Sequence, residues 1–205
     1  MALSRRTEAQ SARRVAIEAA VLQATEELLS AGSSFADLKI EQIATRAGIS
    51  RTAFYFYFSD KRELLMRLAE DVAELLYAQA DRWWSTGKLD ELPEAMGSVV
   101  ALYGEHHALL GAVIEAATYD EEVGAFWRAL FARFVEATRV RIETEQTAGR
   151  APREVSAHAI AFALCWMVEH SCYQLHEQGR PFAPEELRDA LVAIWLGAVA
   201  PTARA

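Results

Sequence analysis

The chain has 205 residues, of which 52% are hydrophobic and 24% are charged, which is typical of a globular protein and excludes a disordered one. The formal net charge of −8 argues against a uniformly basic nucleic-acid binder. The charge is unevenly placed, however, because residues 1–67 hold 10 Lys and Arg against 8 Asp and Glu, and the rest of the chain holds 11 against 21. A basic contact end on an acidic body is therefore predicted.

The sequence gives no sign of membrane insertion or export. It contains no stretch of about 18 apolar residues, as a membrane-spanning helix would require. The first 20 residues include four arginines and no continuous apolar run, so no signal peptide is expected. We expect a cytoplasmic protein of one domain or two small ones that needs no cofactor.

Helical periodicity dominates the N-terminal third of the chain. A first helix is predicted over about Glu8–Leu29, and a short second helix lies near Lys39–Ala47. Gly48 interrupts the pattern, and Ser50 can cap a third short helix that runs to about Phe58. Asp60, with Glu63 three residues later, predicts the start of a fourth helix that continues to about Trp84.

Beyond Gly87 the periodicity is looser but still helical. The helices predicted there are Leu92–Tyr103, His107–Ala117, Asp120–Thr147, Arg153–Gln178 and Pro184–Val199. The last three are separated by turn signals at residues 149–152 and 179–181. No internal repeat or low-complexity tract is present.

Five consecutive aromatic residues occupy the third predicted helix. Phe54 and Phe58 are spaced i, i+4, so they share one helix face and are predicted to join the core. Tyr55 and Phe56 then point away from that core, and Tyr57 lies at its margin. Because a ring can pack on a sugar while its hydroxyl donates to a phosphate oxygen, the outward set predicts contact with DNA.

The segment IATRAGISRTAFYFYFSDKRELL resembles the DNA-binding segment of the TetR family of transcriptional repressors. The matching positions are Ile43, Ala44, Ala47, Gly48, Ile49, Ser50, Phe54, Tyr55, Tyr57, Phe58, Lys61 and Leu64. Phe54 stands where the family usually has Leu, and Arg62 stands where Glu is common. Within the family, SRTAFYFYFSDK and LVAIWLGAV are most similar to the branch that represses the ethionamide-activating monooxygenase.

The resemblance implies an all-α protein of about nine helices, with a three-helix helix-turn-helix DNA-binding domain at residues 1–60 and a ligand-binding and dimerisation domain at residues 61–205. The third helix would enter the major groove, where bases can be told apart. The implied base readers are Arg51, Thr52 and Phe56, the implied phosphate contacts are Tyr55, Tyr57 and Lys61, and further DNA contacts are assigned to Lys39, Arg46 and Ser50.

Four arginines near the N-terminus, Arg5, Arg6, Arg13 and Arg14, have two interpretations. They could form a basic arm near the minor groove or the phosphates, or they could be the solvated start of a helix. The sequence does not decide between the two.

The resemblance also implies an effector site in the C-terminal region. The matched positions are Leu92, Val99, Tyr103, Trp127, Phe131, Phe134, Cys165, Val168 and Trp195. The similar repressor has amide side chains where this chain has Cys165 and Val168, so a more apolar small-molecule effector is implied. The alternative is that these side chains only fill the core, as aromatics at helical spacing usually do.

Two further patterns bear on assembly and on metals. An apolar seam near the C-terminus resembles the family's dimer interface and predicts a homodimer; its members are Leu187, Leu191, Ile194 and Ala198.

Four residues of types that bind metals share one helix face, namely Cys165, Glu169, Cys172 and His176. They extend over roughly 16 Å of helix, too far for one ion, so buried cysteines and no metal are expected.

The function predicted from these patterns is a ligand-responsive, dimeric regulator that binds a palindromic DNA operator and is released by an apolar effector. The alternatives are a helical enzyme and a helical protein-interaction module. No HExxH, GxSxG, Walker or GxGxxG motif is present, so nothing assigns a reaction. DNA binding would distinguish the regulator from both alternatives.

Overall fold

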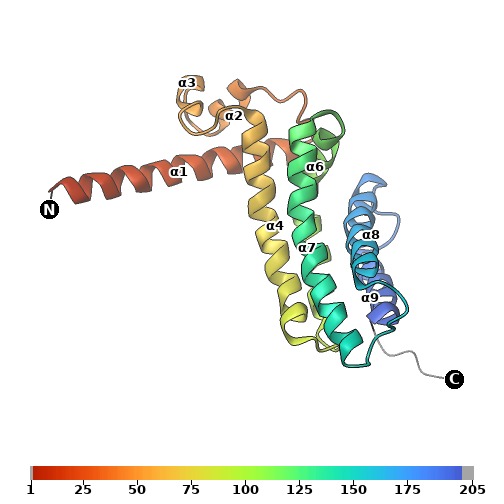
Figure 1. Ribbon diagram of the computed structural model, residues 1–205. Coiled ribbons are helices and arrows are strands. Elements are labelled where there is room, and N and C mark those ends of the chain that lie inside the picture. Colours follow the sequence, from red (N-terminus) through yellow and green to blue (C-terminus); the bar gives the residue numbers. More distant parts are fainter. Residues whose placement is uncertain (1, 200–205) are drawn as a thin grey trace. The chain divides into compact units, whose positions relative to one another are not determined.

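The computed structural model describes residues 2–199, except for the side chains of residues 2–11, and the regular elements in that range are all α-helices (Figure 1). The predicted all-α fold is therefore confirmed. The nine helices of the described chain are α1 (Ala2–Ser30), α2 (Ile40–Arg46), α3 (Arg51–Phe54), α4 (Lys61–Thr86), α5 (Leu92–Glu105), α6 (His107–Tyr119), α7 (Glu121–Thr147), α8 (Ala157–Glu177) and α9 (Pro184–Val199).

The end of α3 and the start of α8 differ from the sequence prediction for local reasons, and α1 begins at Ala2, earlier than the predicted Glu8. α3 ends at Phe54, because the next N–H groups bond to carbonyls three residues back: Phe56 N–H donates to Ala53 and Tyr57 N–H to Phe54. α8 begins at Ala157, several residues later than predicted, because the Ser156 hydroxyl caps it by accepting from the N–H of Ala159.

The described residues divide into two compact units. The first comprises the chain up to Ala69 together with Ala108–Gly124. Its core is formed by buried side chains from α1, α2, α3, α4, α6 and the segment between α3 and α4, namely Val21, Ile43, Phe54, Phe58, Leu64, Leu65, Leu109, Leu110 and Val113. The predicted domain boundary after residue 60 stays a prediction.

The second unit comprises Glu70–His107 and the chain from Ala125 onward. Within it, α5 packs against α8 and α9, and α8 packs against α9. The end of α4 is joined to α7 by the Trp84 indole N–H, which donates to the Thr138 hydroxyl at 3.1 Å. No helix in the described part of the chain is both long and apolar enough to cross a membrane.

Candidate functional site

The turn between α2 and α3 is built by two small residues. Gly48 has φ +70°, a left-handed conformation that glycine adopts without a steric penalty. The N–H of Ile49 bonds back to the carbonyl of Ala44, which closes the end of α2. Ser50 then starts α3, because its hydroxyl accepts from the N–H of Ala53 at 3.1 Å. The helix-turn-helix is therefore fixed by contacts within about ten residues.

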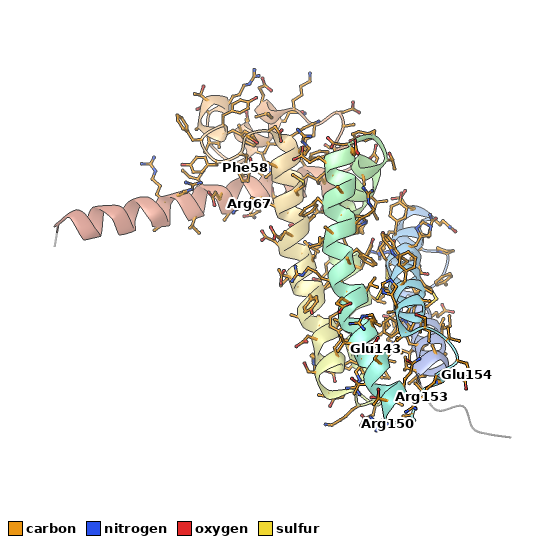
Figure 2. All side chains as sticks on the ribbon, viewed as in Figure 1. Phe58, Arg67, Glu143, Arg150, Arg153 and Glu154 are labelled. Carbon is orange, nitrogen blue, oxygen red and sulfur yellow. The ribbon has the colours of Figure 1, made fainter. Side chains whose placement is uncertain are left out.

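The aromatic run forms two layers, as the sequence predicted. Phe54 and Phe58 are 0% and 1% exposed, and their ring centroids lie 5.4 Å apart. In Figure 2, Arg67 lies beside Phe58, and its guanidinium stands 5.7 Å from the Phe58 ring centroid. Phe56 is 77% exposed and Tyr55 is 47% exposed. The inner pair therefore anchors the turn, and the outer rings are free to contact another molecule.

The charged residues predicted to contact DNA lie on exposed parts of α2 and α3 and are held by surface carboxylates. Arg51 pairs with Glu41 at 2.7 Å, and Arg46 pairs with Glu27 at 2.6 Å. Both arginine side chains remain more than half exposed, so these pairs contribute little to stability and can exchange for phosphate. Lys39 and Thr52 are exposed as well, and Tyr57 is half-buried.

Lys61 does not have the geometry of a phosphate contact. Its ammonium donates to the carbonyls of Phe35, Ala36 and Leu38 at 2.7, 2.8 and 3.2 Å. The same nitrogen stands 5.0 Å from the Phe35 ring centroid. All three donors of the ammonium are used in this way, and burial lowers the pKa of Lys61. Lys61 therefore secures the loop between α1 and α2.

We expect Lys61→Met to lower the free energy of unfolding by about 1–3 kcal/mol, because three carbonyls lose a charged donor. The matched control is Lys39→Met, since Lys39 is exposed and should change stability by less than about 0.5 kcal/mol. Urea denaturation followed by circular dichroism measures both. Equal midpoints for the two variants would contradict this role for Lys61.

The start of α4 explains an unusual residue in the motif. Asp60 and Glu63 cap the helix as predicted: Asp60 accepts from the N–H of Glu63 at 2.8 Å, and Glu63 accepts from the N–H of Ser59 at 2.7 Å. Arg62, where Glu is common in the family, faces Glu122 at 2.6 Å and Asp120 at 3.6 Å. These acids lie more than 50 residues away in the sequence, so no local pattern predicts the pairing.

The N-terminal arginines are only partly described. Arg13 and Arg14 are exposed, and Arg14 pairs with Glu18 on the next turn at 2.8 Å. The side chains of Arg5 and Arg6 lie outside the described residues. The choice between a basic arm and a solvated helix start stays open.

The predicted effector positions all lie in the second unit but differ in burial. Five of them are buried, namely Leu92, Tyr103, Trp127, Cys165 and Trp195. The other four are half-buried, namely Val99, Phe131, Phe134 and Val168. Phe131 and Phe134 belong to a row of rings with Tyr77, Trp84 and Trp166, with neighbouring centroids 4.4–5.9 Å apart. The Trp195 ring instead packs on Trp83, with centroids 5.5 Å apart.

Both cysteines, Cys165 and Cys172, are buried and form no disulfide, as predicted for structural residues.

Several polar groups in the second unit have no partner among the described residues. The indole N–H groups of Trp83 and Trp195 and the hydroxyl of Tyr103 are buried without a hydrogen bond. An unsatisfied buried donor costs about 1–3 kcal/mol, so such groups are expected where a ligand completes the site. The predicted effector set does not include Trp83, whose only signal in the sequence is its place near the end of the fourth helix.

The predicted dimer seam is divided between two faces of α9. Leu187 and Leu191 are buried in the chain's own core, at 8% and 2% exposure, whereas Ile194 is 49% exposed. Ala198 is half-buried. On α8, which packs against α9, Phe162 is 53% exposed. Ile194 and Phe162 are therefore exposed apolar side chains on two helices that pack together, and sequence reasoning missed Phe162.

Both the N-terminal and the C-terminal region of the chain match profiles of known protein families. The profile described as "Bacterial regulatory proteins, tetR family" matches residues 21–68, and the profile described as "Transcriptional regulator EthR, C-terminal domain" matches residues 92–200. The HTH-type transcriptional regulator EthR of Mycobacterium tuberculosis is 30% identical over 187 residues, covering 89% of this chain and 86% of that protein. EthR of Mycolicibacterium smegmatis is 29% identical over 186 residues, covering 89% and 85%.

Solved structures with low sequence identity share the fold. NalD, a repressor of the MexAB-OprM multidrug efflux pump of Pseudomonas aeruginosa, has a TM-score of 0.72 at 20% identity, covering 92% of this chain and 97% of its own. FadR of Bacillus subtilis, in complex with stearoyl-CoA, has a TM-score of 0.74 at 11% identity, covering 85% and 95%.

Proposed function

Because this chain belongs to the TetR family of transcriptional regulators, we propose that it represses transcription as a homodimer that binds a palindromic operator and is released by a small molecule. The observation that carries the proposal is the two-layered aromatic run. Phe54 and Phe58 hold the turn, and Tyr55 and Phe56 project beside the exposed Arg51 and Thr52. This surface offers both phosphate and base contacts.

The proposed base readers are Arg51, Thr52 and Phe56, and the proposed backbone contacts are Tyr55, Tyr57, Lys39, Arg46 and the N-terminus of α3 at Ser50. Arg51 is held by Glu41 at 2.7 Å in the free protein, so binding would exchange that carboxylate for a guanine edge or a phosphate. Lys61 is left out of this set because its donors hold the loop between α1 and α2.

The proposal is tested by fluorescence anisotropy with DNA from upstream of the protein's own gene and with scrambled DNA. We expect preference for a palindrome, with log affinity falling linearly with log salt concentration. Arg51→Ala should reduce discrimination at one base position by about 1–3 kcal/mol. Arg128→Ala is the control, since Arg128 is exposed on α7 in the second unit. Equal affinity for palindromic and scrambled DNA would leave the enzyme and the interaction module as the remaining alternatives.

The proposed effector site lies in the second unit, around the buried members of the predicted set. Tyr103, Trp127 and Trp195 supply ring surface. FadR, whose fold is similar, is in complex with stearoyl-CoA, so the fold of that protein accommodates a ligand with a long acyl chain. α4 begins in the first unit and ends at Thr86 in the second, just after Trp83 and Trp84, which makes it the element through which occupancy would alter DNA binding. A ligand shifts this equilibrium only by its difference in affinity for the two states.

A further inference from the structure

An isolated carboxyl group lies in the interior of the second unit. Glu169 on α8 is 5% exposed, and no ion pair joins its carboxyl group to a cation in the described part of the chain. Burial raises the pKa of Glu169 to about 7. The other buried acid among the described residues, Glu145, differs because it pairs with Arg141 and Arg150. Glu169 alone is an uncompensated acid in this interior among the described residues.

The neighbours of Glu169 belong to the proposed effector site. Cys165 precedes it by one helical turn on the same face of α8, and Cys172 follows by three residues, and both are buried. Across from α8, Tyr103 of α5 is 4% exposed, and its hydroxyl has no partner. The helices that carry the two groups are neighbours, because α5 packs against α8. Burial, and after it the Glu169 carboxyl, raises the pKa of Tyr103.

This combination is suited to a cation. A buried carboxylate is costly unless a positive charge accompanies it, and the described neighbours supply none. An ammonium would favour the ionised form of Glu169 and could donate to the unpartnered Tyr103 oxygen.

We propose that the effector is an apolar molecule carrying one ammonium group, and that Glu169 pairs with that group while Tyr103 orients it. This inference rests on the proposed function, because it names the effector class of the same site. It replaces the purely apolar effector expected from the sequence with an amphiphilic amine.

The test uses phenylbutylamine and its neutral isostere phenylbutanol, with binding to the full chain measured by isothermal titration calorimetry in the absence of DNA. Wild-type protein should bind the amine at least tenfold more tightly than the alcohol. Glu169→Gln should weaken amine binding at least tenfold and leave alcohol binding within twofold. Glu177→Gln is the matched control, since Glu177 is exposed at the end of the same helix and should change neither.

Several results would overturn the inference. The inference is wrong if the wild type does not bind the amine, or if it binds the amine and the alcohol equally tightly. It is also wrong if Glu169→Gln binds the amine as tightly as the wild type. Alcohol binding that depends on the hydroxyl of Tyr103, shown by Tyr103→Phe, would indicate a neutral effector instead. Circular dichroism confirms that Glu169→Gln is folded, and the removal of a buried acid should raise its melting temperature at pH 8. The anisotropy experiment without ligand tests operator binding separately, so the two proposals can fail independently.

Discussion

Phe54→Ala is expected to destabilise the first unit by about 3–5 kcal/mol, whereas Phe56→Ala, two residues further, should change its stability by less than about 0.5 kcal/mol. Phe54 is 0% exposed and packs on Phe58 at 5.4 Å, so truncation leaves a cavity in the centre of the helix-turn-helix. Phe56 is 77% exposed and leaves no cavity. Two members of one aromatic run therefore differ strongly in how much their truncation lowers the free energy of unfolding.

The order of effects reverses for DNA recognition by the folded protein. Phe56→Ala should keep the circular dichroism spectrum and the urea midpoint, and it should weaken binding to the palindrome by about 1–3 kcal/mol, because an apolar base contact is lost. Binding to scrambled DNA should change little, since phosphate contacts remain. An unfolded Phe56→Ala protein, or one that binds the palindrome as tightly as the wild type, would refute the assignment of Phe56 to the outer layer that reads DNA.

The helix-turn-helix could be predicted from the sequence because its contacts are local. Gly48, Ser50 and the Phe54–Phe58 pair lie within about ten residues, and each residue type has one physical reason to be there. Lys61 lies in the same motif, but its acceptors are 23–26 residues away in a loop with no pattern of its own. A match to a family motif therefore predicts a phosphate contact for Lys61 but gives no sign of these three hydrogen bonds to the loop.

The C-terminal site was less predictable because helical periodicity identifies an apolar face without saying what covers it. Leu191 and Ile194 are three residues apart and both fit the predicted seam, yet Leu191 is 2% exposed and Ile194 is 49% exposed. Glu169 was considered only as a metal ligand, because a glutamate on a helix is normally solvated and nothing local shows its burial. Such distinctions depend on which helices pack together.

The largest effect on assembly is expected from Ile194→Glu, which should convert a homodimer to a monomer. Ile194 and Phe162 leave an apolar surface on α9 and α8, and burying that surface against a second copy would remove it from water at about 25 cal/mol per Å². A glutamate there would be buried without a partner at the interface. Light scattering at micromolar concentration measures the mass, with Val140→Glu on α7, also 49% exposed in the wild type, as the matched control.

Leu191→Glu should behave differently although it lies in the same predicted seam. Leu191 is packed inside its own chain, so a charge there should unfold the second unit rather than dissociate a folded dimer. Circular dichroism separates the two outcomes, because Ile194→Glu should keep its helical signal and Leu191→Glu should lose it.

The monomer produced by Ile194→Glu should also bind DNA poorly, which links the interface to function. Two recognition helices meet half-sites about one DNA turn apart, roughly 34–36 Å, only when two chains are joined. Joining them raises the affinity for the whole palindrome by roughly 10²–10⁴ over a single half-site. Affinity for the palindrome should therefore fall at least about 100-fold in Ile194→Glu, while affinity for an isolated half-site stays unchanged. A folded Ile194→Glu protein that remains dimeric, or a monomer that keeps full affinity for the palindrome, would show that this face is not where two chains meet.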